Sequence, residues 1–200
     1  MFLNKYNKAC FLTSMVCVKK NYFSSGKEIA LVGYSNVGKS SIINSLTKNN
    51  KLSKVSKTPG KTKMINFFGL SDGDRLVDLP GYGYAKVSKK IKQDWDYSVN
   101  QYLLNSVFLM GVVVCMDIRH VIKDLDKKII NLIVNNNKLI CLVLTKSDLM
   151  SNVLCKAKIN IIKNYLSFLQ IKIDIILFSS RSFIGVDILQ NKICKWFEGS

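Results

Sequence analysis

The sequence is poor in several residue types, and each scarcity excludes a class of structure. Two prolines in 200 residues argue against long proline-rich linkers, and a hydrophobic content of 48% excludes the composition of a disordered chain. None of the six cysteines belongs to a CxxC pair, and the chain has only one histidine, so we expect no zinc site. Cys115 and Cys141 lie in apolar runs, which predicts core positions in a protein of a reducing compartment.

The chain also lacks a long apolar run near its N-terminus. Residues 9–18 lie between lysines and superficially resemble the apolar part of a signal peptide, but no small-x-small cleavage site follows. Ten residues cannot cross a bilayer, which takes about 20. We predict that residues 1–25 form a leading arm or strand packed on one domain, residues 26–200, and that the chain has no membrane partner.

Acidic residues are scarce as well. The chain has 13 of them against 30 basic residues, which gives a net charge of +17. Such an excess attracts polyanions, RNA among them. Only Arg75, Arg119 and Arg181 are arginines, and Lys, Asn and Ile all have AT-rich codons. Mutational bias therefore explains the excess equally well, and both explanations stay open.

Apolar β-branched runs alternate with helical patterns along the chain. This alternation predicts an α/β protein in three layers, with a mostly parallel sheet between helices. The predicted strands are 28–33, 64–70, 74–79, 111–117, 139–145 and 173–178. The predicted helices are 39–47, 91–104, 124–135, 156–169 and 186–197, and the predicted loops are 49–63 and 80–90. Ligands of such sheets bind at the carboxyl ends of the strands.

The first motif is Gly33-Tyr-Ser-Asn-Val-Gly-Lys-Ser40, which matches GxxxxGK[ST] between a predicted strand and a predicted helix. Its glycines let backbone N–H groups face phosphate oxygens, and the helix N-terminus adds to the attraction. Lys39 is predicted to reach the β- and γ-phosphates, and Ser40 to offer its hydroxyl to Mg²⁺. The alternative, a chance glycine turn, does not account for four fixed residue types in this context.

The second motif is Asp78-Leu-Pro-Gly81 at the end of a predicted strand. Asp78 is predicted to hold Mg²⁺ through water, and Gly81 to give its N–H to the γ-phosphate. Tyr82 follows where Ras-like GTPases carry a glutamine that orients water. We therefore predict that the protein alone hydrolyses its bound nucleotide slowly, and that another group or a partner completes the catalytic site.

The third motif is Thr145-Lys-Ser-Asp148, after another apolar strand. Asp148 can accept hydrogen bonds from guanine N1–H and the 2-amino group, a donor pair that adenine lacks. Lys146 would lay its stem along the base. As an alternative, Asp148 caps a helix. Backbone N–H groups of residues 178–180 can contact guanine O6, and the three motifs together predict a GTP-binding protein.

Two rival functions share parts of this pattern. A kinase or ATPase carries the same phosphate loop, but the guanine motif argues against it. An RNA-binding module that uses nucleotide only structurally remains the alternative.

A threonine in the lysine-rich loop is expected to meet Mg²⁺ when the γ-phosphate is present. This switch threonine is Thr58 or Thr62, because both lie in that loop.

Four stretches resemble the EngB (YihA/YsxC) family of bacterial ribosome-biogenesis GTPases, within the TrmE-Era-EngA-EngB-Septin-like class of P-loop GTPases. The resemblance covers residues 10–198, and its most family-specific part is the third stretch. The stretches are Ser35-Asn-Val-Gly-Lys-Ser-Ser41, Lys57-Thr-Pro-Gly-Lys-Thr62 with Ile65-Asn-Phe-Phe68, Asp78-Leu-Pro-Gly-Tyr-Gly-Tyr-Ala-Lys-Val87 and Asp117-Ile-Arg-His120.

The resemblance implies a small cytoplasmic GTPase that hydrolyses GTP to GDP, binds the precursor of the large ribosomal subunit and is needed for normal cell division and septation. We expect a monomer. The resemblance implies Thr62 as the switch threonine, with Ser40 and Thr62 on Mg²⁺. The candidate catalytic residues are Lys39, Thr62 and Gly81. The implied nucleotide contacts are Gly33, Tyr34, Ser35, Asn36, Val37, Gly38, Lys39, Ser40, Gly60, Lys61, Thr62, Lys63, Met64, Asp78, Leu79, Pro80, Gly81, Thr145, Lys146, Ser147, Asp148, Phe178, Ser179 and Ser180.

Two positions depart from the family pattern. Tyr34 stands where arginine is usual, and Leu149 where lysine is common. Asn36 resembles the potassium-coordinating asparagine of some related GTPases, so K⁺ is a candidate second cofactor that stabilises developing charge.

Two further groups of residues keep two interpretations each. A polar cluster after a buried strand is expected to form a network at the site rim, with His120 as general base the alternative; its members are Asp117, Arg119, His120, Asp124 and Asp126. Tyr82, Tyr84 and Lys86 either contact rRNA or pack within a buried switch.

Overall fold

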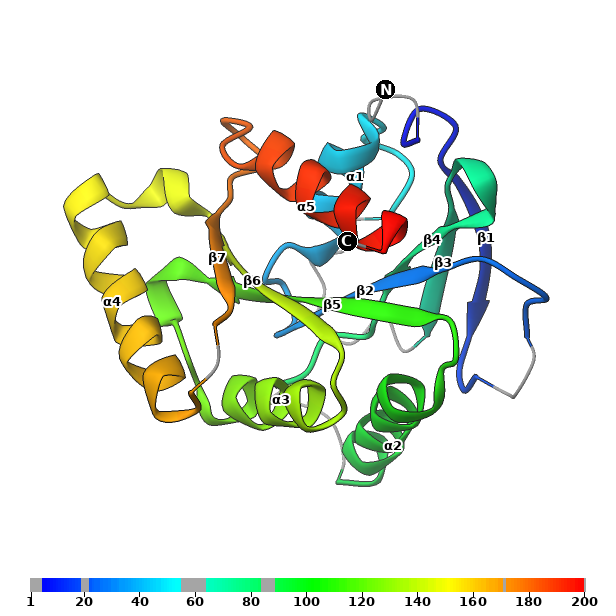
Figure 1. Ribbon diagram of the computed structural model, residues 1–200, viewed down its shortest axis with the longest axis horizontal. Helices are drawn as coiled ribbons and strands as arrows, with labels where there is room; N and C mark the ends of the chain where they lie inside the picture. Colours follow the sequence, from blue (N-terminus) through cyan, green and yellow to red (C-terminus); the bar gives the residue numbers. More distant parts are fainter. Residues whose placement is uncertain (1–4, 19–21, 55–63, 84–88, 171, 200) are drawn as a thin grey trace.

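The computed structural model describes residues 5–18, 22–54, 64–83, 89–170 and 172–199, with the backbone alone over 89–96. In these residues a seven-stranded sheet is covered by helices on both faces (Figure 1), so the predicted α/β fold is confirmed. The strands are β1 (Cys10–Met15), β2 (Glu28–Gly33), β3 (Ile65–Gly69), β4 (Arg75–Asp78), β5 (Leu109–Asp117), β6 (Leu139–Thr145) and β7 (Asp174–Leu177).

The strand order is β1-β3-β4-β2-β5-β6-β7, and the sheet is parallel from β4 to β7. β3 pairs antiparallel with β4, and β1 pairs antiparallel with β3 at the edge. The register places Leu31 beside Asp78 and Asp117 beside Thr145. Because parallel strands end at the same edge, the three sequence motifs meet there.

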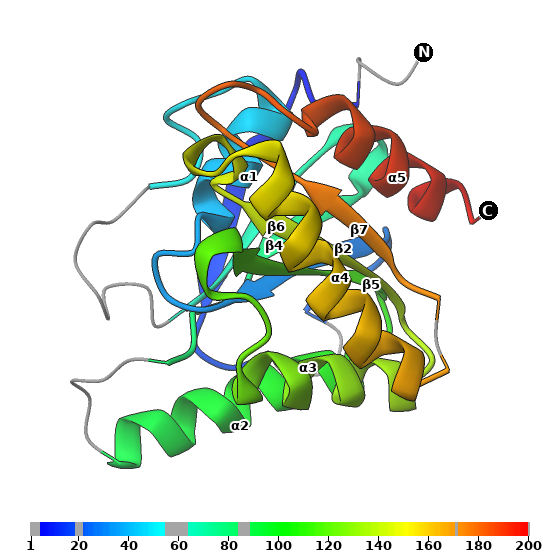
Figure 2. The same ribbon diagram turned by 90° about the vertical axis from the view of Figure 1, so that its left-hand side faces the viewer.

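Five α-helices of the described chain cover the sheet: α1 (Lys39–Thr47), α2 (Lys89–Asn105), α3 (Asp124–Asn135), α4 (Asn152–Phe168) and α5 (Val186–Glu198). Figures 1 and 2 show α1 and α5 on one face and α2 and α3 on the other. α4 packs on the same side as α2 and α3, since Ile162 shares a cluster with Val99 and Ile130. None of these helices is both long and apolar enough to span a bilayer.

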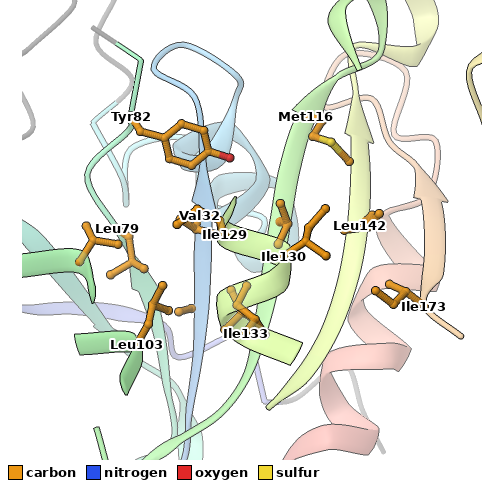
Figure 3. Packing of buried hydrophobic residues seen from close by; sticks show 14 of the residues in the cluster. Val32, Leu79, Tyr82, Leu103, Met116, Ile129, Ile130, Ile133, Leu142 and Ile173 are labelled. Atoms are coloured by element: carbon orange, nitrogen blue, oxygen red, sulfur yellow. The ribbon is translucent and has the colours of Figure 1, made fainter. Parts of the chain in front are cut away.

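Each face of the sheet carries its own apolar core. Side chains of β2 alternate between the two cores, and all six residues of that strand are buried, as expected for a sheet covered twice. Figure 3 shows the cluster under α3, into which the ring of Tyr82 points. Cys115 and Cys141 are fully buried, as predicted, and burial raises the pKa of Cys141 to about 12.

Several boundaries differ from the predicted ones. α4 begins at Asn152, four residues before the predicted start, because the Ser151 side chain caps it by accepting from Leu154 N. α2 begins at Lys89. The short 3₁₀ turns Ile118–His120 and Ser147–Leu149 were not predicted, since three residues are too few for a periodic pattern.

A buried ion pair lies at the amino end of β2. Arg75 Nε donates to Glu28 Oε1 at 2.9 Å, and both side chains are almost wholly inaccessible to solvent. The hydroxyls of Tyr22, Tyr102 and Ser106 all reach Glu28 Oε2, at 2.7, 2.9 and 3.2 Å. This network ties α2 and the segment after β1 to the end of the sheet that lies farthest from the motifs.

Candidate nucleotide-binding site

The phosphate loop turns sharply between β2 and α1, and its glycines permit the turn. A Cβ at Gly33 would lie 2.3 Å from the Cys115 carbonyl oxygen, so only glycine fits against β5. Gly38 adopts φ 108° and precedes the first residue of α1. The loop therefore curls above the positive end of the α1 dipole, as phosphate binding requires.

The side chain of Lys39 folds back over this loop. Its ammonium group lies within 3.5 Å of the carbonyl oxygens of Gly33 and Tyr34, and the residue is only 8% exposed. The long distances mark weak hydrogen bonds, which phosphate oxygens can replace. Lys39 thus holds a positive charge inside the turn.

Ser40 and Asp78 face each other across the mouth of the loop. Ser40 Oγ donates to Asp78 Oδ2 at 2.8 Å, while Oδ1 of the same carboxylate is buried without a hydrogen-bond partner among the described residues. Burial raises the pKa of Asp78, and the Lys39 charge and the hydroxyls of Ser40 and Ser53 oppose that rise. A hydroxyl beside a carboxylate with an unused oxygen fits the oxygen donors that Mg²⁺ prefers.

The segment after Asp78 packs against the phosphate loop. Leu79, Pro80 and Gly81 are buried, and Tyr82 is 2% exposed. The Tyr82 hydroxyl donates to Asp126 Oδ1 at 2.5 Å, on the α3 side of the sheet. Tyr82 therefore follows the buried interpretation, whereas Tyr84 and Lys86 lie outside the described residues.

A pocket of about 140 Å³ opens beside the loop, and residues of the predicted guanine motif line it. Asp148 is exposed in its wall and has no hydrogen-bond or ion-pair partner in the described chain. It does not cap α4, since Ser151 does. The lining residues are Val37, Gly38, Ser41, Thr145, Lys146, Asp148, Leu149, Phe178, Ser180 and Arg181.

The guanine motif is tied to the phosphate loop by two side chains. Thr145 Oγ1 donates to the Val37 carbonyl oxygen at 2.7 Å. Lys146 donates to the Asn36 carbonyl oxygen at 3.0 Å and contacts Asp117 Oδ2 at 2.9 Å. Partial burial acts to raise the pKa of Asp117, but hydrogen bonds from Arg119 and Lys146 outweigh it and hold the pKa below its usual range.

The last wall of the pocket is the turn after β7. Ser147 N donates to the Phe178 carbonyl oxygen at 3.2 Å, which fixes the turn against the guanine motif. Ser179 Oγ accepts from the N–H groups of Arg181 and Ser182, at 3.2 and 3.1 Å. Ser180 is thereby held at the pocket edge.

The structure brings together most of the predicted nucleotide contacts, and it divides one predicted cluster. Gly60, Lys61, Thr62 and Lys63 lie outside the described residues, as does Thr58, while Met64 is exposed just before β3.

The expected polar cluster is not one network. Asp117 and Arg119 join the guanine motif, Asp126 is buried against Tyr82, and Asp124 pairs with Lys127 at the surface. The cause is α3, in which Asp124 and Asp126 are two positions apart and therefore point to opposite sides of the helix. His120 is exposed.

Three pocket residues were not among the predicted nucleotide contacts: Ser41, Leu149 and Arg181. Ser41 lies one residue beyond the phosphate-loop motif, three positions after Gly38, and so shares a helix face with the pocket. Arg181 follows the residues assigned to guanine O6 and is exposed at the rim. Helical spacing could have indicated Ser41, but no sequence signal marks Arg181.

The phosphate loop, the Asp78 strand end and the guanine pocket on this sheet define a P-loop GTPase. A family model described as "50S ribosome-binding GTPase" matches residues 28–146. The probable GTP-binding protein EngB of Hamiltonella defensa is 42% identical over 197 residues, 98% of this chain and 96% of that protein. EngB of Escherichia coli O139:H28 is 40% identical over 192 residues, 96% of this chain and 91% of that protein.

Solved structures agree on the fold. The crystal structure of a probable GTP-binding protein EngB matches with a TM-score of 0.71 at 20% identity, over 86% of this chain and 100% of that chain. Era of Aquifex aeolicus, solved as a variant bound to GDP and AlF4⁻, matches with a TM-score of 0.68 at 23% identity, over 86% of this chain and 57% of that one. The chain belongs to the EngB family of GTP-binding proteins, so it binds GTP and hydrolyses it.

Proposed function

We propose that this GTPase acts as a switch in assembly of the large ribosomal subunit, in the cytoplasm, and that its loss disturbs cell division and septation. One observation in the structure supports the proposal: a pocket whose wall carries Asp148, without a hydrogen-bond or ion-pair partner among the described residues, opens at the same sheet edge as Lys39 and Asp78. The description of the matching family, with its 50S ribosome, supports the partner. The net charge of +17 suits a partner made largely of RNA.

In this proposal different residues at the sheet edge bind the phosphates and the guanine base. The loop residues 33–40 hold the phosphates, and Lys39 meets the β- and γ-phosphates as a point charge. Asp148 accepts from the guanine, and Lys146 covers one face of the base. In-line transfer of the γ-phosphoryl group to water depends mainly on this positioning.

Ser40 and Asp78 are the side chains that would hold Mg²⁺, together with Thr62 as the family resemblance implies. Asp78 would act through water. When bound, Mg²⁺ neutralises the charge that develops on the β- and γ-phosphate oxygens.

Competition for labelled GDP tests the guanine site. GTP is expected to displace GDP from the wild type, ATP is not, and Asp148→Asn should shift preference toward XTP, whose base replaces the 2-amino donor with a carbonyl. Asp72→Asn is the matched control, because Asp72 is exposed in the turn after β3, at the opposite end of the sheet. Equal competition by ATP would show that the assignment of Asp148 is wrong.

Co-sedimentation with isolated large ribosomal subunits tests the partner. We expect binding with a GTP analogue to exceed binding with GDP at least tenfold, and to weaken as salt rises. Small subunits serve as the control. Equal binding in both nucleotide states would favour the alternative, an RNA-binding module in which nucleotide is structural.

Slow intrinsic hydrolysis is a second part of the proposal. The hydroxyl of Tyr82 is committed to Asp126 in the core, so no side chain from the position after Gly81 reaches toward attacking water in this conformation. Single-turnover hydrolysis should therefore be slow for the isolated protein and faster with large subunits. Fast hydrolysis by the protein alone would contradict this.

K⁺ is the proposed second cofactor, at Asn36. Its side chain is exposed and its backbone adopts φ 60°, with the carbonyl held by Lys146. A monovalent cation at this point would lie beside the phosphates. Turnover should be faster in KCl than in NaCl at equal ionic strength, and equal rates would exclude the site.

A further inference from the structure

The chain beyond β4 is joined to the phosphate loop through its backbone. Ser35 N donates to the Tyr82 carbonyl oxygen at 2.9 Å, and Tyr82 N donates to the Gly33 carbonyl oxygen at 3.2 Å. These two bonds make an isolated parallel bridge between Tyr34 and Tyr82. The loop that should face phosphate thus has part of its backbone paired with the second motif.

Gly81 packs so closely on the loop that a methyl group on its Cα would clash with it. A Cβ on Gly81 would lie 2.7 Å from Ser35 Cα and 3.1 Å from Lys39 Nζ. A γ-phosphate that accepts from both Lys39 and the Gly81 N–H needs its oxygens between these donors, about 2.7–3.2 Å from each. The third phosphate can therefore enter only when the Gly81–Tyr82 segment moves away from the loop.

Side-chain contacts of Tyr82 hold that segment in place. The Tyr82 hydroxyl donates to Asp126 Oδ1, whose other oxygen accepts from Lys123 N at 2.9 Å at the start of α3. Asp126 is 1% exposed, so this is a hydrogen bond to a buried carboxylate. The Tyr82 ring also packs edge-on against Tyr34, with centroids 4.6 Å apart. Figure 3 shows the ring turned into the core beneath α3.

We propose that the Tyr82–Asp126 hydrogen bond sets the discrimination between GTP and GDP, by holding Gly81 in the space of the third phosphate. GDP leaves the bond intact, because its two phosphates lie over the loop and the α1 N-terminus. GTP must displace Gly81 and with it Tyr82, so the bond lowers its affinity relative to that of GDP. The inference rests on the proposed phosphate site at residues 33–40.

Affinities for GDP and a non-hydrolysable GTP analogue, measured by calorimetry on the full chain with Mg²⁺, test this. Tyr82→Phe keeps the ring and removes the hydroxyl. Because a hydrogen bond to a charged group is strong, we expect the analogue to bind about tenfold more tightly and GDP to bind within twofold of wild type. Asp126→Asn weakens the same bond without removing the acceptor, so a smaller gain of the same sign is expected.

The matched control is Tyr102→Phe, which removes another buried tyrosine hydroxyl from a carboxylate, Glu28, at the far end of the sheet. It should leave both affinities unchanged. The inference is overturned if Tyr82→Phe leaves the ratio of the two affinities unchanged or lowers the affinity for the analogue. Failure of the wild type to bind GDP would instead refute the phosphate site itself.

A second readout keeps the test independent of folding defects. In the wild type, the analogue should speed hydrogen exchange at the amides of Ser35 and Tyr82 relative to GDP, because their bridge opens. Slower or equal exchange at these amides with the analogue would also overturn the inference.

Discussion

Lys146 donates to Asp117 Oδ2 across 2.9 Å and to the Asn36 carbonyl oxygen across 3.0 Å. One side chain thus joins the end of β5 to the guanine motif and to the phosphate loop. The Lys146 backbone adopts φ 59°, a conformation that costs a non-glycine residue free energy. The two contacts offset that cost, and they fix the lysine stem at the pocket before the base arrives, which lowers the entropy lost on binding.

Asp117→Asn should therefore weaken GDP and GTP binding alike, by about tenfold, because the ammonium group loses its charged partner. Fluorescence titration with labelled nucleotides measures this. Asp124→Asn is the control, since the Asp124 side chain is 93% exposed and pairs only with Lys127 among the described residues. Unchanged affinity, or a loss confined to one nucleotide, would show that Asp117 does not position Lys146.

The same carboxylate should make stability depend on pH in a defined direction. The folded state holds the pKa of Asp117 below its ordinary value of 3.8, so the unfolded chain binds the proton more tightly. The stabilisation is complete above pH 3.8 and is lost as pH falls below it. Urea unfolding of wild type and Asp117→Asn should differ by on the order of 1 kcal/mol at about pH 6, because the pair is partly exposed, and by less at about pH 3. A constant difference would contradict the assigned cause.

Sequence pattern was sufficient for the elements that place the phosphate loop. β2 and α1 have the predicted bounds because a run of buried residues and a helix starting at the motif lysine are local signals. The guanine motif was likewise predicted as one unit, and the structure adds the contacts that join it to the loop.

Long-range pairings could not be read from the sequence. Tyr82 and Asp126 are 44 positions apart, and nothing local indicates that they share a hydrogen bond. The polar residues after β5 are close in sequence, which predicts one cluster, but they belong to separate contacts in space. The start of α4 was missed because a single capping serine precedes a first turn without clear periodicity.

Gly33→Ala should abolish nucleotide binding and destabilise the fold by about 2–4 kcal/mol. The added methyl group would lie 2.3 Å from the Cys115 carbonyl oxygen and 3.0 Å from Val37, and the backbone of β5 cannot yield without breaking strand pairing. Urea unfolding measures the loss. Gly73→Ala is the control for adding a methyl group, because a Cβ there meets nothing within 4 Å. Its positive φ of 77° still carries a smaller cost. Equal losses in the two variants would refute the steric argument.

The buried pair of Glu28 and Arg75 gives the last prediction. Removing one partner leaves the other charge buried, so Arg75→Met should destabilise the fold by about 3–5 kcal/mol. Part of that loss comes from a cation–π contact, since the guanidinium carbon lies 4.0 Å from the centre of the Phe23 ring. The double variant Glu28→Gln with Arg75→Met should lose less than the sum of the single variants, because the uncompensated charge is gone.

The control for this pair is Lys192→Met, which breaks an ion pair with the exposed Asp174 and should cost less than about 1 kcal/mol. Additive losses in the double variant would show that Glu28 and Arg75 contribute independently. GDP affinity serves as a second readout, and we expect it to be unchanged in Arg75→Met, since β4 carries Arg75 at one end of the strand and Asp78 at the other. A fall in GDP affinity that matches the loss of stability would mean that this network also shapes the nucleotide edge of the sheet.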